Sequence, residues 1–345
     1  MRPDRGLPGG SAPGGPRRRG VDLPAGTEER QPEPDSSTVN LPQFPPLNPI
    51  ALTAIAQKVG AHSARQLPST GIFNSIYSLD ERYILRVPRQ ASDFIEALRR
   101  EVVAIPLVRQ AGVRTPKVVL YDDSLEIIET PYLIVEQLQG QNLAGLNLAP
   151  EQTPQVWREL GRDLAVLHQT DSTDQAIRDF ADYPMPDPRE LNQNLALKGY
   201  YTALEAAWIE GWLEKLAPYA LAPNLHCFRH GDIQTTNLMV EPSAPTYLAL
   251  IDWGAACWGD PAFDFAGIPL QAVPMMLEGY REVAPIVDES LEARILWRHL
   301  QLSLYLLSRP PLPNLSWAER PLGMMLQTLR FLLDSKDSTW RQLVL

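Results

Sequence analysis

The sequence predicts an α+β protein in which a small β-rich lobe precedes a larger helical lobe. Short runs rich in β-branched and aromatic residues, bounded by turn residues, gather in the first part of the chain. Beyond Gly140, apolar residues recur at helical spacing over longer segments. Ahead of both lies a stretch with the composition of a flexible tail. We therefore expect a tail over 1–45, a first lobe over 46–138 and a second lobe over 139–345.

Proline and glycine mark the predicted tail. Residues 1–50 hold eleven of the 33 prolines and seven of the 21 glycines, which are residues that break helices and strands. The charges of this stretch cancel, so the net charge of −10 belongs to the remainder of the chain. An acidic surplus argues against sequence-independent nucleic-acid binding, which needs a positive surface. We therefore expect no nucleic-acid partner.

The sequence has no feature that predicts a membrane partner or export. It contains no run of about 18 uncharged apolar residues, so we expect no membrane span. The basic stretch Arg17–Arg19 is not followed by the apolar segment of a signal peptide. Cys227 and Cys257 are too few for a disulfide framework and lack metal-site spacing. We expect a cytoplasmic protein with two reduced thiols.

The first lobe is expected to be β-rich. An amphipathic helix is predicted at 50–59, ahead of a strand–turn–strand unit at 67–88 with its turn at Asp80-Glu81. A helical stretch follows at 93–108, which Pro106 should interrupt because proline lacks the N–H of the helical hydrogen bond. The remaining predicted strands are 117–121 and 132–136.

The second lobe is expected to be mostly helical. Thr153-Pro154 has the features of a helix start, a capping residue followed by proline at the first helical position. The apolar stripe of this helix consists of Val156, Leu160, Leu164 and Leu167. The other expected elements are a helix at 200–216, two or more helices within 290–334, and strands at 227–229, 237–240 and 247–251.

The segment 230–264 carries the polar residues of a candidate reaction site. Asp232 and Asn237 flank a loop of four residues, and Asp252 follows fifteen residues later. The apolar residues between Asn237 and Asp252 form two runs around a turn at 241–246, which predicts a hairpin. Such a hairpin would return Asp252 to the neighbourhood of Asn237. Two carboxylates and an amide oxygen then converge, and hard oxygen ligands of this kind suit Mg²⁺ with substrate phosphates.

This arrangement favours phosphoryl transfer to a hydroxyl. One carboxylate can orient the hydroxyl and accept its proton, while the other ligands hold the metal ion. Phosphoryl transfer needs few further parts, because its catalysis consists mostly of positioning and charge neutralisation. An acid, an Asn five residues on and an Asp after a hairpin follow the logic of kinase catalytic and magnesium loops.

The complete string resembles a known family. Its parts are His230-Gly-Asp-x4-Asn237, Ile251-Asp-Trp and Gly259-Asp-Pro-x2-Asp264. In this string the chain resembles the aminoglycoside phosphotransferase family of kinase-like small-molecule kinases, which includes macrolide and choline-type kinases. The resemblance extends over about 65–268. It implies a two-lobed protein-kinase-like fold that binds nucleotide between the lobes, with ATP, or alternatively GTP, as the donor.

The resemblance also implies roles for individual residues of the string. Asp232 would be the catalytic base, and Asn237 and Asp252 would hold Mg²⁺. His230 would brace the catalytic loop, and Asp264 would be structural.

Upstream, the resemblance places Arg86 on the strand whose basic residue holds the nucleotide α- and β-phosphates. Many family members have Lys at this position, so the chain departs from the common pattern. Arg can bind phosphate through two hydrogen bonds and keeps its charge. Glu101, fifteen residues later in the predicted helix, would be its ion-pair partner; the alternative is an exposed helix charge.

Four further residues are expected to contact the nucleotide on the same resemblance. Gly71 and Asn74 fall where a loop should cover the phosphates, although an ordinary hairpin turn is the alternative. Glu136 and Leu138 fall at the inter-lobe hinge, where adenine would use main-chain groups, although Glu136 could instead be an exposed linker charge.

The function predicted from these residues is transfer of the γ-phosphoryl group to a hydroxyl of a small molecule. An aminoglycoside or a macrolide as acceptor would make antibiotic resistance the outcome, whereas a metabolite or amino-alcohol kinase of the same fold fits equally. A kinase-like binding protein without turnover is a further alternative. Acidic residues of the second lobe would suit a cationic acceptor, namely Glu278, Glu282, Asp288, Glu289 and Glu292.

Overall fold

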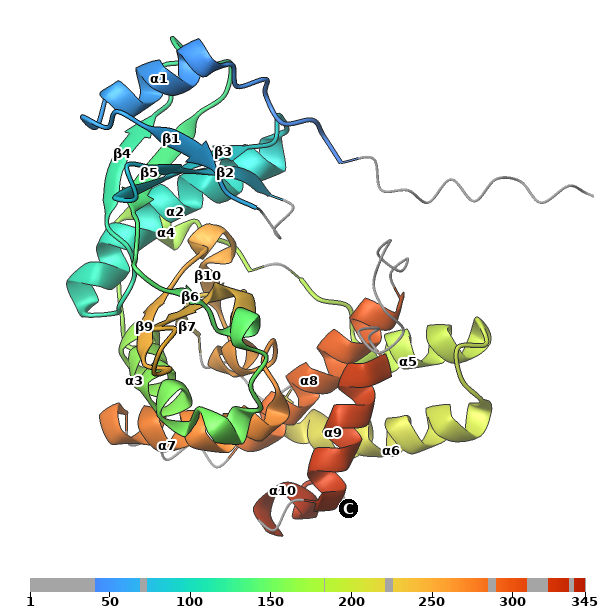
Figure 1. Cartoon of the computed structure of the whole chain (residues 1–345). Helices are drawn as coiled ribbons and strands as arrows, with labels where there is room; N and C mark the ends of the chain where they lie inside the picture. The colour runs from blue at the N-terminus through green and yellow to red at the C-terminus, as the bar shows by residue number, and fades with distance from the viewer. Residues whose placement is uncertain are drawn as a thin grey trace, which may run out of the picture. The chain divides into compact units, whose positions relative to one another are not determined.

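The computed structural model describes residues 41–68, 73–182, 184–220, 226–284, 290–308, 322–334 and 338–344 (Figure 1). A β-sheet lobe comes first and a mainly helical portion follows, as the sequence predicts. Residues 1–40 of the predicted tail lie outside the described residues. Within the described ranges, no helix combines the length and the apolar character that crossing a membrane requires.

One antiparallel sheet of five strands forms the first lobe, in the order β1-β2-β3-β5-β4 (Figure 1). The strands are β1 (Ala64–Gln66), β2 (Asn74–Leu79), β3 (Tyr83–Pro88), β4 (Val118–Asp122) and β5 (Tyr132–Glu136). The turn between β2 and β3 falls at Asp80 and Glu81, as predicted, and both residues have left-handed backbone angles. Arg86 of β3 pairs with Ile76 of β2 and with Leu133 of β5.

The two faces of this sheet pack against different helices. These helices are α1 (Pro49–Gln57) and α2 (Ser92–Ala111). On one face, Leu85 is buried together with Ile55 of α1. On the other face, Leu133 belongs to the main core, which includes Leu98 of α2. Because successive strand residues point to opposite faces, Arg86 faces the α2 side.

Helix α2 continues through Pro106, where the sequence analysis expects an interruption, and ends at Ala111. That expectation is wrong because Ile105 and Val108 are buried in the main core on either side of the missing hydrogen bond. Packing of both halves therefore keeps the helix continuous. Gly112 ends the helix with a φ of 107°, a left-handed angle that favours glycine.

The second lobe combines helices with two small antiparallel sheets. Its helices are α3 (Pro154–His168), α4 (Gln175–Arg178), α5 (Pro188–Leu197), α6 (Ala203–Ala220), α7 (Val273–Val283), α8 (Leu291–Ser308), α9 (Leu322–Asp334) and α10 (Ser338–Gln342). Its strands are β6 (Gln141–Asn142), β7 (Cys227–Arg229), β8 (Leu238–Val240), β9 (Tyr247–Leu250) and β10 (Cys257–Gly259). Strands β6, β8 and β9 form one sheet, and β7 pairs with β10. The sequence analysis predicts neither α5 nor α7.

Helix α3 begins at Pro154, as predicted, but Thr153 is not a side-chain cap. The Thr153 hydroxyl donates instead to the main-chain oxygen of Pro150 at 3.4 Å. The predicted apolar stripe of α3 is buried in full.

Two glycines let α3 and α7 approach closely. A Cβ on Gly161 of α3 would collide with the main-chain oxygen of Met276. A Cβ on Gly279 of α7 would likewise collide with the main-chain oxygen of Arg158. The Arg158 side chain also forms an ion pair with Glu278 at 2.6 Å. The absence of side chains at these two positions therefore sets how closely the two helices pack.

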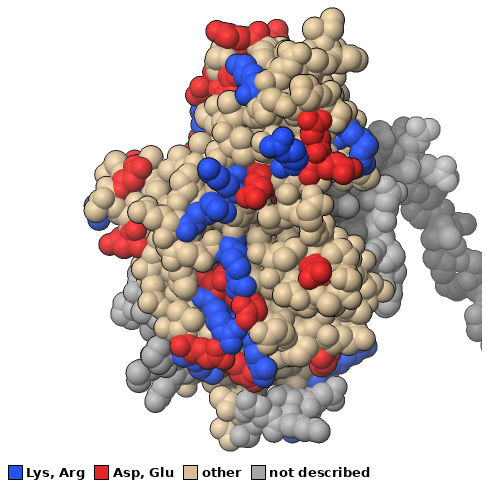
Figure 2. Space-filling model, turned by 60° about the vertical axis from the view of Figure 1, so that its left-hand side comes forward, with Lys and Arg blue, Asp and Glu red and all other residues tan. Residues whose placement is uncertain are grey.

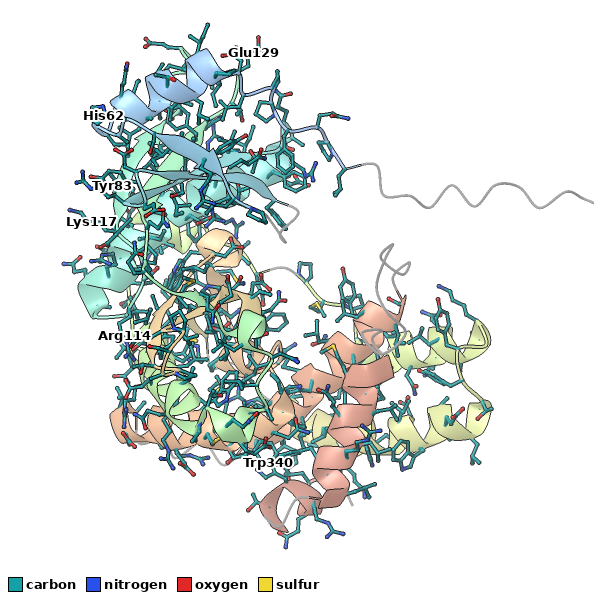
Figure 3. All side chains as sticks on the ribbon, viewed as in Figure 1. His62, Tyr83, Arg114, Lys117, Glu129 and Trp340 are labelled. Carbon is teal, nitrogen blue, oxygen red and sulfur yellow. The ribbon has the colours of Figure 1, made fainter. Side chains whose placement is uncertain are left out.

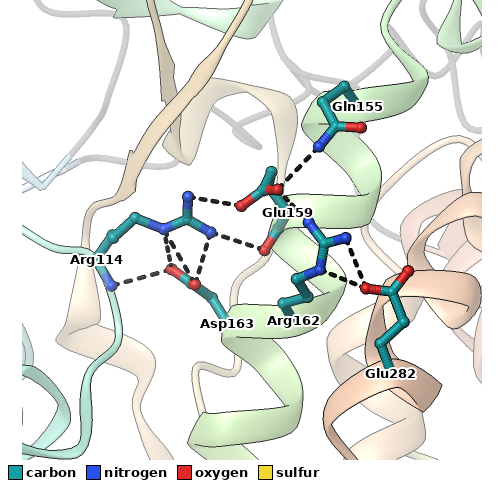
Figure 4. Close-up of polar contacts among 6 residues, drawn as sticks. All are labelled: Arg114, Gln155, Glu159, Arg162, Asp163 and Glu282. Carbon is teal, nitrogen blue, oxygen red and sulfur yellow. Dashed lines mark hydrogen bonds and ion pairs between the residues drawn. The ribbon is translucent and has the colours of Figure 1, made fainter.

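A charged network ties the loop after α2 to α3 (Figure 4). Arg114 donates to Asp163 from its main-chain N–H and its guanidinium, at 2.8–3.1 Å, and to Glu159 at 2.9 Å. Arg162 contacts Glu159 as well and donates to Glu282 of α7 at 2.7 Å. The first lobe is therefore fixed to the helical lobe at this loop.

The end of the described chain packs against the helical lobe. Trp340 of α10, labelled in Figure 3, meets the ring of Phe331 of α9 edge-on, with 5.5 Å between ring centroids. Lys215 of α6 donates to the main-chain oxygen of Val344 at 2.9 Å.

Residues 41–45, which the sequence analysis assigns to the tail, include contacts with the sheet lobe. The Arg89 guanidinium lies 3.9 Å from the ring centroid of Phe44 and donates to the main-chain oxygen of Pro42 at 2.6 Å. The main-chain N–H of Gln90 donates to the main-chain oxygen of Gln43 at 3.1 Å. The boundary between the lobes near residue 138 stays a prediction.

Candidate active site

The candidate catalytic loop begins at the end of β7, where glycine is required. Gly231 has a φ of 80°, and a Cβ there would collide with the main-chain oxygen of Ala255. The carboxylate of Asp264, which is fully buried, accepts hydrogen bonds from the main-chain N–H groups of His230 and Gly231, both at 2.8 Å. These contacts fix the backbone that carries Asp232.

The buried Asp264 carboxylate is itself held from α3. His168, at the end of α3, lies with its Nε2 3.1 Å from Asp264 and its Nδ1 3.0 Å from the hydroxyl of Tyr280. Since the carboxylate can only accept, His168 donates to it from Nε2. Burial alone would raise the pKa of Asp264, but the hydrogen bond from His168 and the charge of that histidine help to hold the pKa below its ordinary value.

His230 braces the loop through both ring nitrogens. Its Nδ1 lies 3.2 Å from the main-chain N–H of Asp232, and its Nε2 lies 3.1 Å from the main-chain oxygen of Ile251. The first contact requires an acceptor and the second a donor, so the ring is in one neutral tautomer. A bracing role therefore accounts for both nitrogens, as the sequence analysis expects.

Asp232 is a partly buried carboxylate with two side-chain donors. Gln234 donates to one carboxylate oxygen, and Asn237 donates to the other at 3.2 Å. Burial raises the pKa of Asp232 above its ordinary value, and the charge of Asp252 acts in the same direction. The hydrogen bonds from Gln234 and Asn237 oppose that rise. The group is thus more basic than an ordinary aspartate.

The predicted hairpin brings Asp252 back to Asn237. Strands β8 and β9 pair antiparallel, and the main-chain N–H of Ile251 donates to the main-chain oxygen of Asn237 at 3.0 Å. Asp252 has a φ of 70° and a ψ of 68°, a left-handed conformation that is uncommon outside glycine. Its side chain is 38% exposed, so it can still reach a ligand.

Arg86 joins Asp252 to α2. Its Nη1 donates to Glu101 at 2.6 Å and its Nη2 to Asp252 at 2.8 Å. The ion pair between Arg86 and Glu101 is therefore present as expected, and Asp252 is a second partner that the sequence analysis does not anticipate. Burial alone would lower the pKa of Arg86, but the charges of Glu101 and Asp252 outweigh it and raise the pKa above the ordinary value.

The other residues expected to contact nucleotide are Gly71, Asn74, Glu136 and Leu138. Gly71 lies outside the described residues. Asn74 is buried at the start of β2. Glu136 is exposed at the end of β5, and its main-chain N–H already donates to Lys117. Leu138 is half-buried just beyond it. Their proposed contacts with nucleotide stay predictions.

Two side chains that sequence reasoning overlooks also hold the site. Gln234 lies inside the loop between Asp232 and Asn237, and no sequence pattern predicts that a residue at this position contacts Asp232. Arg100 of α2 donates to the main-chain oxygen of Ala256, beyond Asp252, at 3.2 Å. Its position beside Glu101 is the only sequence signal for that role.

The donor set of this site fits a magnesium ion. Asn237 uses its amide nitrogen toward Asp232, and no described residue donates to its Oδ1. Likewise, no hydrogen bond from the described residues engages Oδ2 of Asp252. No cluster of three or more His, Cys, Asp or Glu in the described part of the chain could enclose a metal ion. Two hard oxygens completed by substrate phosphates match the usual preference of Mg²⁺.

The acidic residues considered for a cationic acceptor are largely neutralised. Glu278 pairs with Arg158, Glu282 with Arg162 and Glu292 with Arg281, in that order along the chain. Asp288 and Glu289 lie outside the described residues. On the face shown in Figure 2, acidic and basic side chains lie beside one another rather than in a patch of one sign. These residues therefore give no support for a cationic acceptor.

A β-sheet lobe followed by a helical portion with this loop arrangement is a kinase-like fold. The model of the phosphotransferase enzyme family matches residues 64–293, and the chain belongs to that family. The chain resembles, at 15% identity, the solved GDP complex of wild-type aminoglycoside 2'-phosphotransferase-IIIa, with a TM-score of 0.59 over 81% of this chain and 96% of that one.

Two further relatives widen the comparison. A choline/ethanolamine kinase family protein from Mesorhizobium loti has a TM-score of 0.58 at 15% identity over 86% of this chain and 97% of its own. The curated protein acyl-CoA dehydrogenase family member 11 from Rattus norvegicus is 22% identical over 212 residues, which are 58% of this chain and 27% of that protein. The chain thus spans about a quarter of the length of that relative.

Proposed function

We propose that this protein transfers the γ-phosphoryl group of a nucleoside triphosphate to a hydroxyl of a small molecule. The observation that carries the proposal is the joining of Asp232, Asn237 and Asp252 through one hairpin and a shared set of hydrogen bonds. Membership of the phosphotransferase enzyme family supports it independently.

In this proposal Asp232 orients the acceptor hydroxyl and accepts its proton. Its raised pKa makes it a stronger proton acceptor than an ordinary aspartate, and general-base catalysis is most effective when the pKa of the base approaches the working pH. The hydrogen bonds from Gln234 and Asn237 hold the carboxylate in one orientation.

Asn237 and Asp252 would hold the magnesium ion, each through its unengaged side-chain oxygen. When bound, magnesium neutralises charge on the donor phosphates. Arg86 would hold the phosphates that do not react, because its charge is permanent and Glu101 fixes its guanidinium.

The donor would be ATP or GTP, and the acceptor class is open to test. The GDP complex of the aminoglycoside phosphotransferase favours including GTP, and the two solved relatives favour aminoglycosides and amino alcohols as acceptors. The name of the curated relative adds hydroxylated acyl compounds to the acceptors worth testing.

The test is a screen for phosphorylated product by mass spectrometry. The full chain is incubated with Mg²⁺ and ATP or GTP against aminoglycosides, macrolides, amino alcohols and hydroxyacyl thioesters. With an accepted substrate, Asp232→Asn should lower kcat by about 10²–10⁴-fold, the usual contribution of a general base. Nucleotide affinity should stay close to that of the wild type.

A matched control separates the role of the site from the loss of any aspartate. Asp123 is exposed and lies outside the network, so Asp123→Asn should leave kcat within twofold of the wild type. If Asp232→Asn and Asp252→Asn both turn over like the wild type, the proposed mechanism is wrong. Absence of both product and nucleotide binding in the wild-type protein would favour a kinase-like protein without turnover.

A further inference from the structure

The left-handed backbone of Asp252 needs an explanation outside the loop that carries it. Its φ of 70° and ψ of 68° place a non-glycine residue in a sparsely populated conformation. Such conformations persist where several contacts of the surrounding structure hold them in place. The contacts of the next residue, Trp253, supply that constraint.

Trp253 is fully buried and held on two sides. Its indole Nε1 donates to the hydroxyl oxygen of Thr115 at 2.9 Å, and Thr115 is itself 4% exposed. The indole ring meets the ring of His230 at 4.6 Å between centroids with an interplanar angle of 62°. The main-chain oxygen of Trp253 accepts from Ala256 at 3.0 Å. The hydrogen bond to Thr115 fixes the orientation of the indole ring.

Thr115 lies on a segment that is anchored to the helical lobe. The preceding residue, Arg114, is bonded to α3 through Asp163, and its main-chain oxygen accepts from Leu250 at 2.9 Å. Arg109 donates to the main-chain oxygen of Thr115. The acceptor for the Trp253 indole is therefore held in place from both lobes.

We propose that Thr115 is a positioning residue, which orients Asp252 by fixing the Trp253 indole. Thr115 touches neither the nucleotide nor the acceptor in this proposal and acts only through Trp253. The inference rests on the proposed function, in which Asp252 holds magnesium. Loss of the Thr115 hydroxyl leaves a buried indole N–H without an acceptor, so Trp253 has reason to move and the strained backbone of Asp252 loses one constraint.

The test measures how much magnesium strengthens nucleotide binding. The dissociation constant of ATP is determined by calorimetry with and without Mg²⁺, and the ratio of the two values isolates the contribution of the metal ion. Thr115→Val keeps the shape of the side chain and removes the hydroxyl, so this ratio should fall about tenfold, or about 1.4 kcal/mol. Thr115→Ser keeps the hydroxyl and should retain the ratio within twofold.

A second variant and a matched control keep the result interpretable. Trp253→Phe removes the indole donor and should lower the ratio in the same way, which covers the case in which Thr115→Val fails to fold. Thr328 is 2% exposed on α9, and its hydroxyl donates to the main-chain oxygen of Met324 at 3.1 Å. Thr328→Val, the same chemical change, should leave the ratio unchanged.

The indole N–H of Trp253 provides a direct readout by NMR, since its signal is the one absent from Trp253→Phe. That signal should shift in Thr115→Val and not in Thr115→Ser. If it stays in place, or if it shifts while the magnesium ratio stays within twofold of the wild type, the inference is overturned. An unchanged ratio in Asp252→Asn would instead overturn the proposed role of Asp252, which distinguishes the two failures.

Discussion

At Asp232, the requirements of proton transfer and of fold stability oppose each other. A proton acceptor benefits from a raised pKa, and burial provides it here, yet burial also makes the ionised carboxylate unfavourable in the native state. Gln234 and Asn237 offset part of that cost with hydrogen bonds. The residue that we assign to proton transfer is therefore expected to lower the stability of the fold at neutral pH.

The isosteric variant Asp232→Asn tests this expectation in the absence of magnesium. Because the native pKa is raised, ionisation destabilises the native state as pH rises above the ordinary pKa of an aspartate. A neutral amide removes that effect, so Tm at pH 7 should rise; a gain of roughly 1 kcal/mol would appear as about 1–2 °C in a chain of this size. Thermal unfolding at pH 7 and at pH 4 measures it. A gain in Tm that is no larger at pH 7 than at pH 4 would show that the charge is not responsible.

Residue-scale contacts also show where sequence reasoning ends. The pair of Arg86 and Glu101 lies fifteen residues apart, and a family resemblance is sufficient to predict it. The contact of Arg86 with Asp252 spans 166 residues, and that of Thr115 with Trp253 spans 138. Neither has a spacing that a pattern could reveal, because only the packing of the two lobes creates it.

At the scale of elements, local patterns predict well where one turn or one apolar stripe decides the structure. The hairpin of β8 and β9 follows from two apolar runs around a turn, and the buried stripe of α3 follows from helical spacing. Pro106 is misread because tertiary packing overrides a local helix breaker. Helix α7 has a helical apolar pattern in Val273, Met276, Leu277 and Tyr280, which the sequence analysis passes over.

Replacing glycine by alanine should have opposite effects on stability at the α3–α7 crossing and at an open position of α6. Gly161→Ala places a Cβ against the main chain of Met276, so the free energy of unfolding should fall by at least about 2 kcal/mol. Gly211 of α6 has open space around its Cα, so Gly211→Ala should raise it by about 0.5–1 kcal/mol. Urea unfolding of the two variants measures both effects. Equal effects at the two positions would contradict the account of this helix crossing.

At the scale of the whole molecule, acid should weaken the fold through one buried histidine. Burial lowers the pKa of His299 on α8 to about 4, and its Nε2 contacts the main-chain oxygen of Phe265 at 2.8 Å. The unfolded chain binds a proton at about pH 6.5 whereas the native state does not, so stability is lost as pH falls from 6.5 toward 4. At about 1.4 kcal/mol per pH unit, this group alone should cost about 3 kcal/mol over that interval.

The variant His299→Gln isolates this contribution, because the amide can still donate to Phe265 but does not titrate. Urea unfolding at several pH values from 7 to 4 should show a shallower loss of stability in the variant than in the wild type. Parallel curves for the two proteins would mean that another group governs the response to acid.

The sequence is sufficient to predict the arrangement of the lobes and the family, but not the acceptor. The order of a sheet lobe and a helical lobe follows from composition and periodicity, and the family follows from the string between His230 and Asp264. The acceptor does not follow, because its binding depends on side chains of the helical lobe that obey no local rule. The paired acidic residues of that lobe illustrate the point, since their charge in the sequence suggested a role that their ion pairs remove.

Phosphorus NMR of the running reaction tests the central claim most directly. With ATP, Mg²⁺ and an acceptor identified by the screen, the signal of the γ-phosphate should fall while the signal of a phosphate ester on the acceptor rises. The Asp232→Asn protein should form that ester at least about 10²-fold more slowly. Inorganic phosphate as the sole product, or ester formation at the wild-type rate in Asp232→Asn, would contradict phosphoryl transfer by this site.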